Sequence, residues 1–208
     1  NSHYTANLVK SVAKSVSVKA ISLPVNSQMF YPTAPKHNDN ILHICSISRL
    51  EKFKGHDFIL KTISTLPESY KEKIKLSIAG KGPYKNTLEQ LSFDLKLNNI
   101  IDFLGFIPSS GMNDFYSSHD LFILCTREEP ELRNVEGFGL VFTESQSCGT
   151  AVIATRTGGI SDAVKENDGG WLIQQDNTDE LHNILMKLIE NKKLAWEQGT
   201  KARERVLR

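Results

Sequence analysis

Short apolar segments alternate with amphipathic segments along most of the chain. The apolar segments are four to seven residues long and suit β-strands, at 41–47, 74–79, 100–104, 121–125, 151–155 and 170–173. Between them, apolar residues recur at helical spacing in 56–66, 84–97, 112–118, 139–147, 160–165, 179–189 and 194–206. Strands that alternate with helices predict an α/β fold, a Rossmann-like parallel sheet with helices on both faces.

The first forty residues lack this regular alternation. Apolar positions recur at loose helical spacing over 4–16, a short apolar run covers 18–23, and residues 27–40 are rich in Pro, Asn and Thr. The composition of 27–40 is typical of an irregular connection. We therefore expect one domain over residues 41–208, with a helix and a linker ahead of it in residues 1–40.

Ligands of open parallel sheets bind beyond the carboxyl ends of the strands. The informative loops are those after Ile47, Ala79, Leu104, Cys125 and Thr155. The first of them places Arg49, Lys52 and Lys54 just ahead of a predicted helix. Cations beside a helix N-terminus suit a diphosphate, although a solvated charged loop would have the same composition.

Two of these loops are rich in glycine. Gly80-Lys-Gly-Pro83 follows one strand and Thr157-Gly-Gly-Ile160 follows another. Glycine lets a ligand approach the backbone closely, but both sequences also suit tight turns. The first loop does not complete a dinucleotide-binding Gly-x-Gly-x-x-Gly fingerprint, because the third glycine is missing.

The loop after Cys125 is long and charged, and it leads into the most unusual stretch of the chain. Residues 126–136 suit either a functional loop or a mobile surface insertion. Then comes Glu136-Gly-Phe-Gly-Leu-Val-Phe-Thr-Glu144, which opens a predicted helix. Its glycines free backbone amides for an anion. Its two glutamates suit sugar hydroxyls, because a carboxylate accepts several directed hydrogen bonds.

The overall composition is that of an ordinary soluble globular protein. A formal net charge of +1 gives no broad electrostatic footprint for nucleic acid. Cys45, Cys125 and Cys148 lie far apart in apolar surroundings, which predicts buried thiols in a reducing compartment. The six histidines are scattered, with no pair at metal-ligand spacing, so we expect no metal site. No apolar run approaches the length of a membrane span, and no signal peptide is visible.

Six motifs occur in order between residues 41 and 195. They are Ser-Arg-Leu…Lys-Gly-His (48–56), Ile-Ala-Gly-Lys-Gly-Pro (78–83), Leu-Gly-Phe-Ile (104–107), Glu-Gly-Phe-Gly-Leu-Val-Phe-Thr-Glu (136–144), Cys-Gly-Thr-Ala-Val-Ile-Ala (148–154) and Gly-Gly-Ile (158–160). Together they resemble the carboxy-terminal domain of the family 4 retaining glycosyltransferases, the glycosyltransferases group 1. The chain departs from the usual family pattern at Ser145 and Ser147, where Ala is usual, and at Ala151, where Pro is frequent.

The resemblance implies a GT-B architecture, in which two Rossmann-like domains face a cleft and the second holds most of a sugar nucleotide. Arg49 and Lys54 would bind the diphosphate and stabilise the leaving group, and Glu136 would lie beside the donor sugar. Glu144 would hold the ribose hydroxyls. The other donor-binding residues that it implies are Gly82, Gly105, Phe106, Gly137, Phe138, Gly139, Leu140 and Val141.

The resemblance also implies a reaction and its setting. A UDP- or GDP-linked sugar would be transferred with retention to a saccharide or lipid acceptor, without a metal or cofactor, in surface polysaccharide or glycolipid synthesis. We expect a cytoplasmic enzyme whose full-length form can associate with the inner face of the membrane. Residues 1–40 resemble only the last helix and linker of the acceptor-binding amino-terminal domain. We therefore expect this chain to bind donor weakly and not to transfer sugar.

Three alternatives stay open. The first is a sugar-nucleotide epimerase of the same architecture, for which we would expect different acidic and histidine motifs. The second is a nicotinamide-dependent oxidoreductase, which needs a Gly-x-Gly-x-x-Gly after the first strand that this chain lacks. The third is a non-catalytic module that binds nucleotide or a protein partner.

Overall fold

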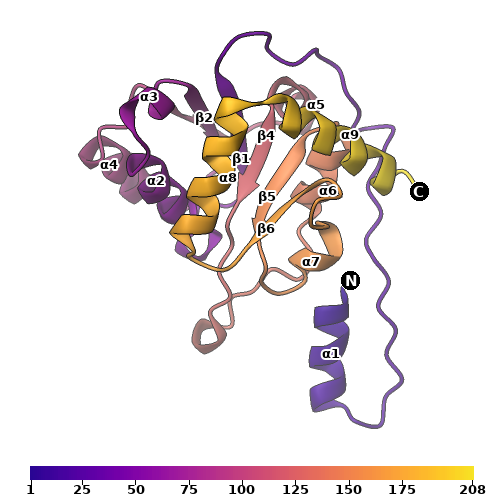
Figure 1. Cartoon of the computed structure of the whole chain (residues 1–208). Helices are drawn as coiled ribbons and strands as arrows, with labels where there is room; N and C mark the ends of the chain where they lie inside the picture. Colours follow the sequence, from indigo (N-terminus) through magenta and orange to yellow (C-terminus); the bar gives the residue numbers. More distant parts are fainter.

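Six parallel strands form one sheet in the order β3-β2-β1-β4-β5-β6 (Figure 1). The computed structural model describes all of residues 1–208. The strands are β1 (Leu42–Ile47), β2 (Ile74–Ala79), β3 (Ile101–Gly105), β4 (Leu121–Leu124), β5 (Ala151–Thr155) and β6 (Gly170–Ile173). The order reverses between β1 and β4, and crevices that bind ligands form at such a switch point. The predicted Rossmann-like sheet is confirmed.

Helices cover both faces of this sheet (Figure 1). One face carries α2 (His56–Ser64), α4 (Lys85–Asp94) and α8 (Thr178–Glu190), and the short α3 (Glu68–Lys71) follows α2. The other face carries α5 (Ser109–Ser118), α6 (Leu140–Ser147) and α7 (Ile160–Ala163). The last helix, α9 (Lys193–Val206), packs against α6, β5 and β6.

The strands separate two apolar clusters, one under each helical layer. Along β4, Leu121 and Ile123 enter the cluster under α2, α4 and α8, whereas Phe122 and Leu124 enter the cluster under α5, α6 and α7. This alternation follows from the two-residue repeat of a strand. Every side chain of β4 is buried, which explains why the central strands are apolar throughout rather than alternating with polar residues.

Residues 1–40 stand apart from this regular domain (Figure 1). Helix α1 (His3–Val12) is followed by a linker without regular helix or strand, which runs along the domain to β1. Several hydrogen bonds fix the linker to the domain, and two of them illustrate the contact. The Ser147 hydroxyl donates to the Phe30 carbonyl at 2.6 Å, and Lys36 Nζ donates to the hydroxyl of Thr150 at 2.8 Å.

The sequence placed the elements correctly and missed mainly at their ends. The helix expected over 4–16 ends at Val12, and the helix expected over 84–97 ends at Asp94. Lys96 takes a left-handed backbone conformation with φ of 58°, which an α-helix does not continue through. Helix α3 was not predicted, because four residues are too few to show a helical period.

Two further expectations concern buried thiols and membrane spans. Cys45, Cys125 and Cys148 are free and buried, as predicted. Burial raises the pKa of the Cys148 thiol to about 11, so the thiol stays protonated. None of the helices combines the length and the apolar character needed to cross a bilayer.

Candidate functional site

Two glycines bring the loops after β1, β2 and β4 into direct contact. A Cβ on Gly55 would lie 2.0 Å from the Cys125 carbonyl oxygen, and a Cβ on Gly80 would lie 1.9 Å from the Ser48 carbonyl oxygen. Both glycines have positive φ, 77° and 124°. Only glycine suits these positions, because any side chain would collide with backbone. The close loops form the floor of a site at the carboxyl edge of the sheet.

A pocket of about 550 Å³ opens beside these loops. Its walls come from the ends of β1 and β2, the loop after β3, and helices α5 and α6. Met29 and Phe30 of the linker close one side of it. Its charged lining consists of Arg49, Lys81 and Glu144. The pocket therefore combines an apolar wall with cations at one place and a carboxylate at another, as sites for small polar ligands do.

Phe106 forms an exposed aromatic wall of the pocket. Its side chain is 66% exposed, and Lys81 Nζ lies 5.3 Å from the ring centroid. Residues 101–105 form β3, and Gly105 turns the chain with φ of 70° just before Phe106. A flat aromatic face beside a cation offers a stacking surface to a planar ligand group.

Lys54 and Glu136 form an ion pair at the carboxyl edge of the sheet. The distance from Lys54 Nζ to Glu136 Oε2 is 2.7 Å, and the two side chains are 14% and 19% exposed. Lys54 ends the short 3₁₀ helix η1 (Lys52–Lys54). Arg49, on the same loop, is 76% exposed and pairs with Glu51 at 3.2 Å. Of these two cations, Lys54 is largely buried in its ion pair, whereas Arg49 is exposed to solvent.

Helix α6 points its N-terminus toward this edge of the sheet. Gly139 takes φ of 83° directly ahead of Leu140, and no side chain caps the helix. Uncapped amide groups and the helix dipole together attract an anion. Phe138 is 3% exposed and belongs to the core cluster under α5, α6 and α7, so it anchors the turn rather than facing a ligand.

Glu144 lies half-buried in the pocket, one turn into α6. It accepts a hydrogen bond of 2.9 Å from the hydroxyl of Tyr116 on α5. Burial raises the pKa of the Glu144 carboxyl, and the hydrogen bond from Tyr116 offsets part of that shift. Tyr116 itself is fully buried, and its burial and the adjacent carboxylate keep its pKa well above its ordinary value. Tyr116 therefore acts as a fixed hydrogen-bond donor to Glu144.

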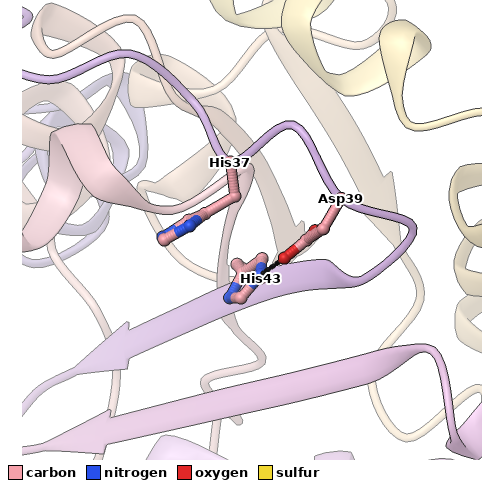
Figure 2. A group of neighbouring side chains, drawn as sticks. All are labelled: His37, Asp39 and His43. Atoms are coloured by element: carbon pink, nitrogen blue, oxygen red, sulfur yellow. Dashed lines mark hydrogen bonds and ion pairs between the residues drawn. The ribbon is translucent and has the colours of Figure 1, made fainter.

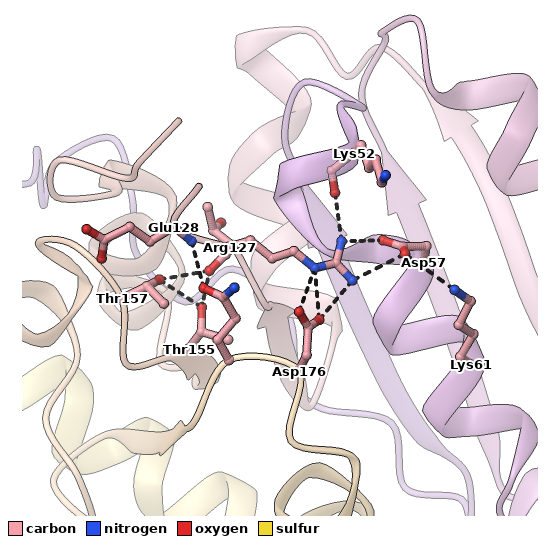
Figure 3. A network of polar contacts seen from close by, with 10 residues as sticks. Lys52, Asp57, Lys61, Arg127, Glu128, Thr155, Thr157 and Asp176 are labelled. Atoms are coloured by element: carbon pink, nitrogen blue, oxygen red, sulfur yellow. Dashed lines mark hydrogen bonds and ion pairs between the residues drawn. The ribbon is translucent and has the colours of Figure 1, made fainter. Parts of the chain in front are cut away.

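Arg127 joins three loops behind the site (Figure 3). Its guanidinium donates to both carboxylate oxygens of Asp57 at 2.8 and 3.2 Å, and Nε donates to Asp176 at 2.8 Å. Nη1 also donates to the Lys52 carbonyl at 3.0 Å, and the Arg127 amide donates to the Phe53 carbonyl at 2.6 Å. These contacts hold η1, and with it the backbone that carries Lys54.

The charged loop after β4 has local structure of its own. It contains a 3₁₀ turn, η2 (Pro130–Leu132), closed by an antiparallel bridge between Glu129 and Asn134. Tyr4 of α1 donates to Glu128 at 2.5 Å, and the His3 amide donates to Asp162 at 2.6 Å. The N-terminal end of α1 therefore docks beside this loop.

The structure brings some of the expected donor-binding residues together and leaves others apart. Arg49, Phe106, Val141 and Glu144 line the pocket. Gly82 does not, because it packs on the Leu50 backbone, where a Cβ would lie 2.3 Å from the carbonyl oxygen. Leu140 is 43% exposed outside the pocket lining, and Gly137 lies beside the Asn1 side chain, with 3.4 Å from an added Cβ to Asn1 Nδ2.

Sequence reasoning missed Lys81 and Tyr116. Lys81 stands in the middle of the glycine loop at 80–83, and its position beyond a strand end was a usable signal. The role of Tyr116 could not be recognised from the sequence, because a tyrosine at an apolar helical position looks like any other aromatic residue of the core.

Two histidines that the sequence spacing does not pair lie close together in the fold. They are His37 and His43, with stacked rings whose centroids are 4.0 Å apart. The irregular linker turn produces this contact, so residue spacing alone could not predict it. His56 is fully buried and bonds to Ser46 at 3.2 Å.

A second hollow of about 430 Å³ follows the free edge of β6 beside α8. Two of its charged residues pair with each other: Arg156 contacts Glu166 at 3.0 Å and donates to the Leu172 carbonyl, while Glu166 accepts from the Leu172 amide. This ion pair occupies the outward hydrogen-bonding groups of an edge strand, which protects such an edge from pairing with another chain.

A match to a family model shows to which protein family the chain belongs. Residues 29–205 match the model of the family described as "Glycosyl transferases group 1". The chain belongs to this family. The match covers every strand of the sheet and every residue that lines the pocket, which confirms the resemblance found in the motifs.

Among curated relatives of this group 1 chain is the GDP-mannose-dependent monoacylated alpha-(1-6)-phosphatidylinositol monomannoside mannosyltransferase of Corynebacterium glutamicum. The two are 31% identical over 144 residues, which are 69% of this chain and 37% of the relative. The chain spans less than half the length of the curated mannosyltransferases that it matches.

Solved structures of glycosyltransferases share the fold. Sucrose-phosphate synthase of Thermosynechococcus elongatus superposes with a TM-score of 0.83 at 23% identity, over 100% of this chain and 52% of the synthase. Anabaena HepE, solved in complex with UDP-glucose, superposes with a TM-score of 0.75 at 22% identity, over 90% of this chain and 52% of HepE. At this identity the likeness concerns the fold alone.

Proposed function

We propose that this chain is the donor-binding half of a retaining glycosyltransferase and that a nucleoside-diphosphate sugar occupies the pocket beside α6. One observation carries the proposal. Glu144 lines a pocket together with Arg49, and the Lys54–Glu136 ion pair and the open N-terminus of α6 lie at the same edge of the sheet. A nucleoside at the Phe106 and Glu144 end would direct its diphosphate toward these positive groups.

Each group has a chemical role in this proposal. Cleavage of the bond between sugar and diphosphate develops negative charge on the leaving phosphate and positive charge on the sugar. Arg49, Lys54 and the α6 amides would stabilise the leaving phosphate. Glu136 would orient the donor sugar, and Glu144 would accept hydrogen bonds from the ribose hydroxyls. The acceptor would attack from the face that the phosphate leaves, which retains the configuration.

Relatives and neighbours suggest the donor classes to test. The Corynebacterium relative is GDP-mannose-dependent, and HepE was solved with UDP-glucose. We propose a GDP- or UDP-linked hexose as donor and a saccharide or lipid as acceptor, in surface polysaccharide or glycolipid synthesis. In this proposal residues 1–40 are the end of an acceptor-binding amino-terminal domain and the linker to the donor domain 41–208. The isolated chain then binds donor without transferring sugar.

A thermal-shift panel tests the proposal. GDP, UDP, ADP and their hexose conjugates are each added to the chain at millimolar concentration, and the melting temperature is recorded. Ligands that bind only the folded state raise it. We expect GDP or UDP and the matching sugar nucleotide to raise it, and ADP to do so least. Equal shifts in melting temperature for all three nucleotides, or no shift for any of them, contradict the proposal. Conversion of the sugar nucleotide to an epimer, a separate readout, would indicate an epimerase instead.

A further inference from the structure

Three potential metal ligands meet where the linker enters β1, at the edge of the sheet opposite the donor pocket (Figure 2). His37 and Asp39 belong to the linker, and His43 belongs to β1. One nitrogen or oxygen atom from each lies within 4.8 Å of the others. His43 Nε2 lies 3.0 Å from Asp39 Oδ2, and the His37 and His43 rings stack at an interplanar angle of 23°.

Neighbouring groups hold the side chain of Asp39 and the backbone of His43. Asp39 Oδ1 accepts from the Ile41 amide at 3.0 Å and from Lys192 Nζ at 3.2 Å, which turns Oδ2 toward the histidines. The His43 amide donates to Asp120 Oδ2 at 3.0 Å, which fixes the start of β1. Hydrogen bonds of this kind from surrounding groups orient the ligands of metal sites.

The local charge leaves room for a cation. Lys192 is shared between two carboxylates, at 3.2 Å from Asp39 and 3.8 Å from Asp120. Two carboxylates and one ammonium give the group a net charge of −1 when the imidazoles are neutral. Lys36 lies farther in and is committed to the His119 carbonyl and Thr150.

We propose that His37, Asp39 and His43 bind a divalent transition-metal ion of the zinc class. Two imidazoles and one carboxylate suit Zn²⁺, Co²⁺ or Ni²⁺ rather than Mg²⁺ or Ca²⁺, which prefer oxygen ligands. In a tetrahedral zinc site with bonds of about 2.0–2.2 Å, ligand atoms lie about 3.4 Å apart. The His43–Asp39 separation of 3.0 Å is close to this value. The exposed His37 ring rotates out of its stack to supply the third ligand, and water takes the fourth position.

The metal would tie the linker to the sheet. His37 and Asp39 lie on the linker, His43 lies on β1, and Lys192, which binds Asp39 and the His37 carbonyl, precedes α9. A bound ion would therefore join the end of the linker to the start of β1, next to the contact that Lys192 makes with Asp39. This role is separate from donor binding, because the cluster and the pocket lie at opposite ends of β1.

Cobalt and zinc titrations of the whole chain test the site. The protein is stripped with chelator, dialysed, and titrated with Co²⁺ while the visible spectrum is recorded, and with Zn²⁺ by calorimetry. We expect one ion per chain, the intense absorption of tetrahedral cobalt, and a higher melting temperature with Zn²⁺. His37→Ala removes an exposed side chain that makes no hydrogen bond, so this variant keeps the metal-free melting temperature and loses about tenfold or more in zinc affinity.

Matched variants separate a built site from general histidine binding. Asp39→Asn keeps the shape of the side chain and its place beside Ile41, and it weakens zinc binding as His37→Ala does. His182→Ala removes a histidine on α8 outside the cluster and leaves zinc affinity unchanged. The proposal is overturned if the wild-type chain binds no zinc, if the cobalt spectrum shows only weak octahedral bands, or if His37→Ala binds zinc as tightly as the wild type.

Discussion

Lys54 and Glu136 are 82 residues apart in sequence and are joined by a 2.7 Å ion pair at the carboxyl edge of the sheet. The pair links the loop after β1 to Glu136, in the turn that leads into α6. In the proposed site, Lys54 stabilises the leaving phosphate and Glu136 orients the donor sugar. Glu136 would then hold the lysine in place while the pocket is unliganded, and a donor phosphate would compete with it for the same ammonium group.

Glu136→Gln is expected to have opposite effects on two classes of ligand. The variant releases Lys54 from its carboxylate partner, so a bare nucleoside diphosphate binds more tightly than to the wild type. A sugar nucleotide gains the same benefit but loses the contact to its hexose, which is worth about 1.5–3 kcal/mol for a charged acceptor. Calorimetry with GDP or UDP and with the matching sugar nucleotide measures both effects. A variant that weakens both ligands equally would contradict this assignment.

The affinity for nucleotide is expected to fall at acidic pH as Glu144 becomes protonated, which gives the pH profile an acid limb. The Glu144 carboxylate must be ionised to accept both ribose hydroxyls, and burial raises the pKa of this group above its ordinary value of 4.5. Wild-type affinity therefore falls on acidification sooner than an ordinary carboxyl would allow, and Glu144→Gln removes that limb. Tyr116→Phe deletes the hydrogen bond that favours the charged form, so it moves the limb to higher pH. Affinities measured at several pH values test this, and identical profiles for wild type and Glu144→Gln would refute it.

Arg127 is expected to be a major contributor to stability. Its side chain is 13% exposed and that of Asp57 is 6% exposed. Burial opposes ionisation of Asp57, but the hydrogen bonds and charge of Arg127 outweigh it, so the pKa of the Asp57 carboxyl is lowered. Arg127→Ala leaves that carboxylate buried with the largely exposed Lys61 ammonium, 3.7 Å away, as its remaining cation, and removing one partner of a buried pair costs up to about 3–5 kcal/mol. Urea unfolding measures the loss.

The control for Arg127 is the double variant Arg127→Ala with Asp57→Asn. It removes the stranded charge and recovers part of the lost free energy of unfolding, because the two residues interact directly. Additive losses in the double variant would show that the ion pair is not the source of the effect.

His56 is expected to make the protein sensitive to mild acid. Burial lowers the pKa of His56 to about 4, from 6.5. The folded state therefore resists protonation that the unfolded state accepts, so stability is complete above pH 6.5 and falls as the pH approaches 4. The shift corresponds to about 3 kcal/mol over that window. His56→Gln cannot titrate, and its unfolding free energy should fall less over the same range, whereas His182→Gln should follow the wild type.

Much of the fold could be predicted from the sequence because the sheet is buried on both faces. All side chains of β4 and β5 are buried, so each strand appears as an uninterrupted apolar run. Helix ends were less predictable. The left-handed residue Lys96 ends α4, and a lysine at that position carries no strong stop signal.

Residues of the candidate site could be selected from the sequence where they lie in short motifs. Glu136 and Glu144 flank a glycine turn, and Lys54 stands in a cationic loop beyond a strand, so motif and topology together pointed to them. Contacts that depend on how helices pack together, or on the path of an irregular segment, were not predictable. The bond from Tyr116 to Glu144 joins two helices, and the stack of His37 on His43 depends on the path of an irregular linker.

Calorimetric titration of GDP and UDP into the wild-type chain and two lysine variants tests the central claim most directly. Lys54→Ala removes the cation proposed to bind the diphosphate, and Lys201→Ala removes the same charge from an exposed position on α9. We predict that the wild type binds at least one of the two nucleotides at a single site. Lys54→Ala should bind it about tenfold or more weakly, a loss of about 1.4 kcal/mol, while Lys201→Ala binds it as the wild type does. A wild-type chain that binds neither nucleotide, or a Lys54→Ala variant that binds with wild-type affinity, would contradict the account.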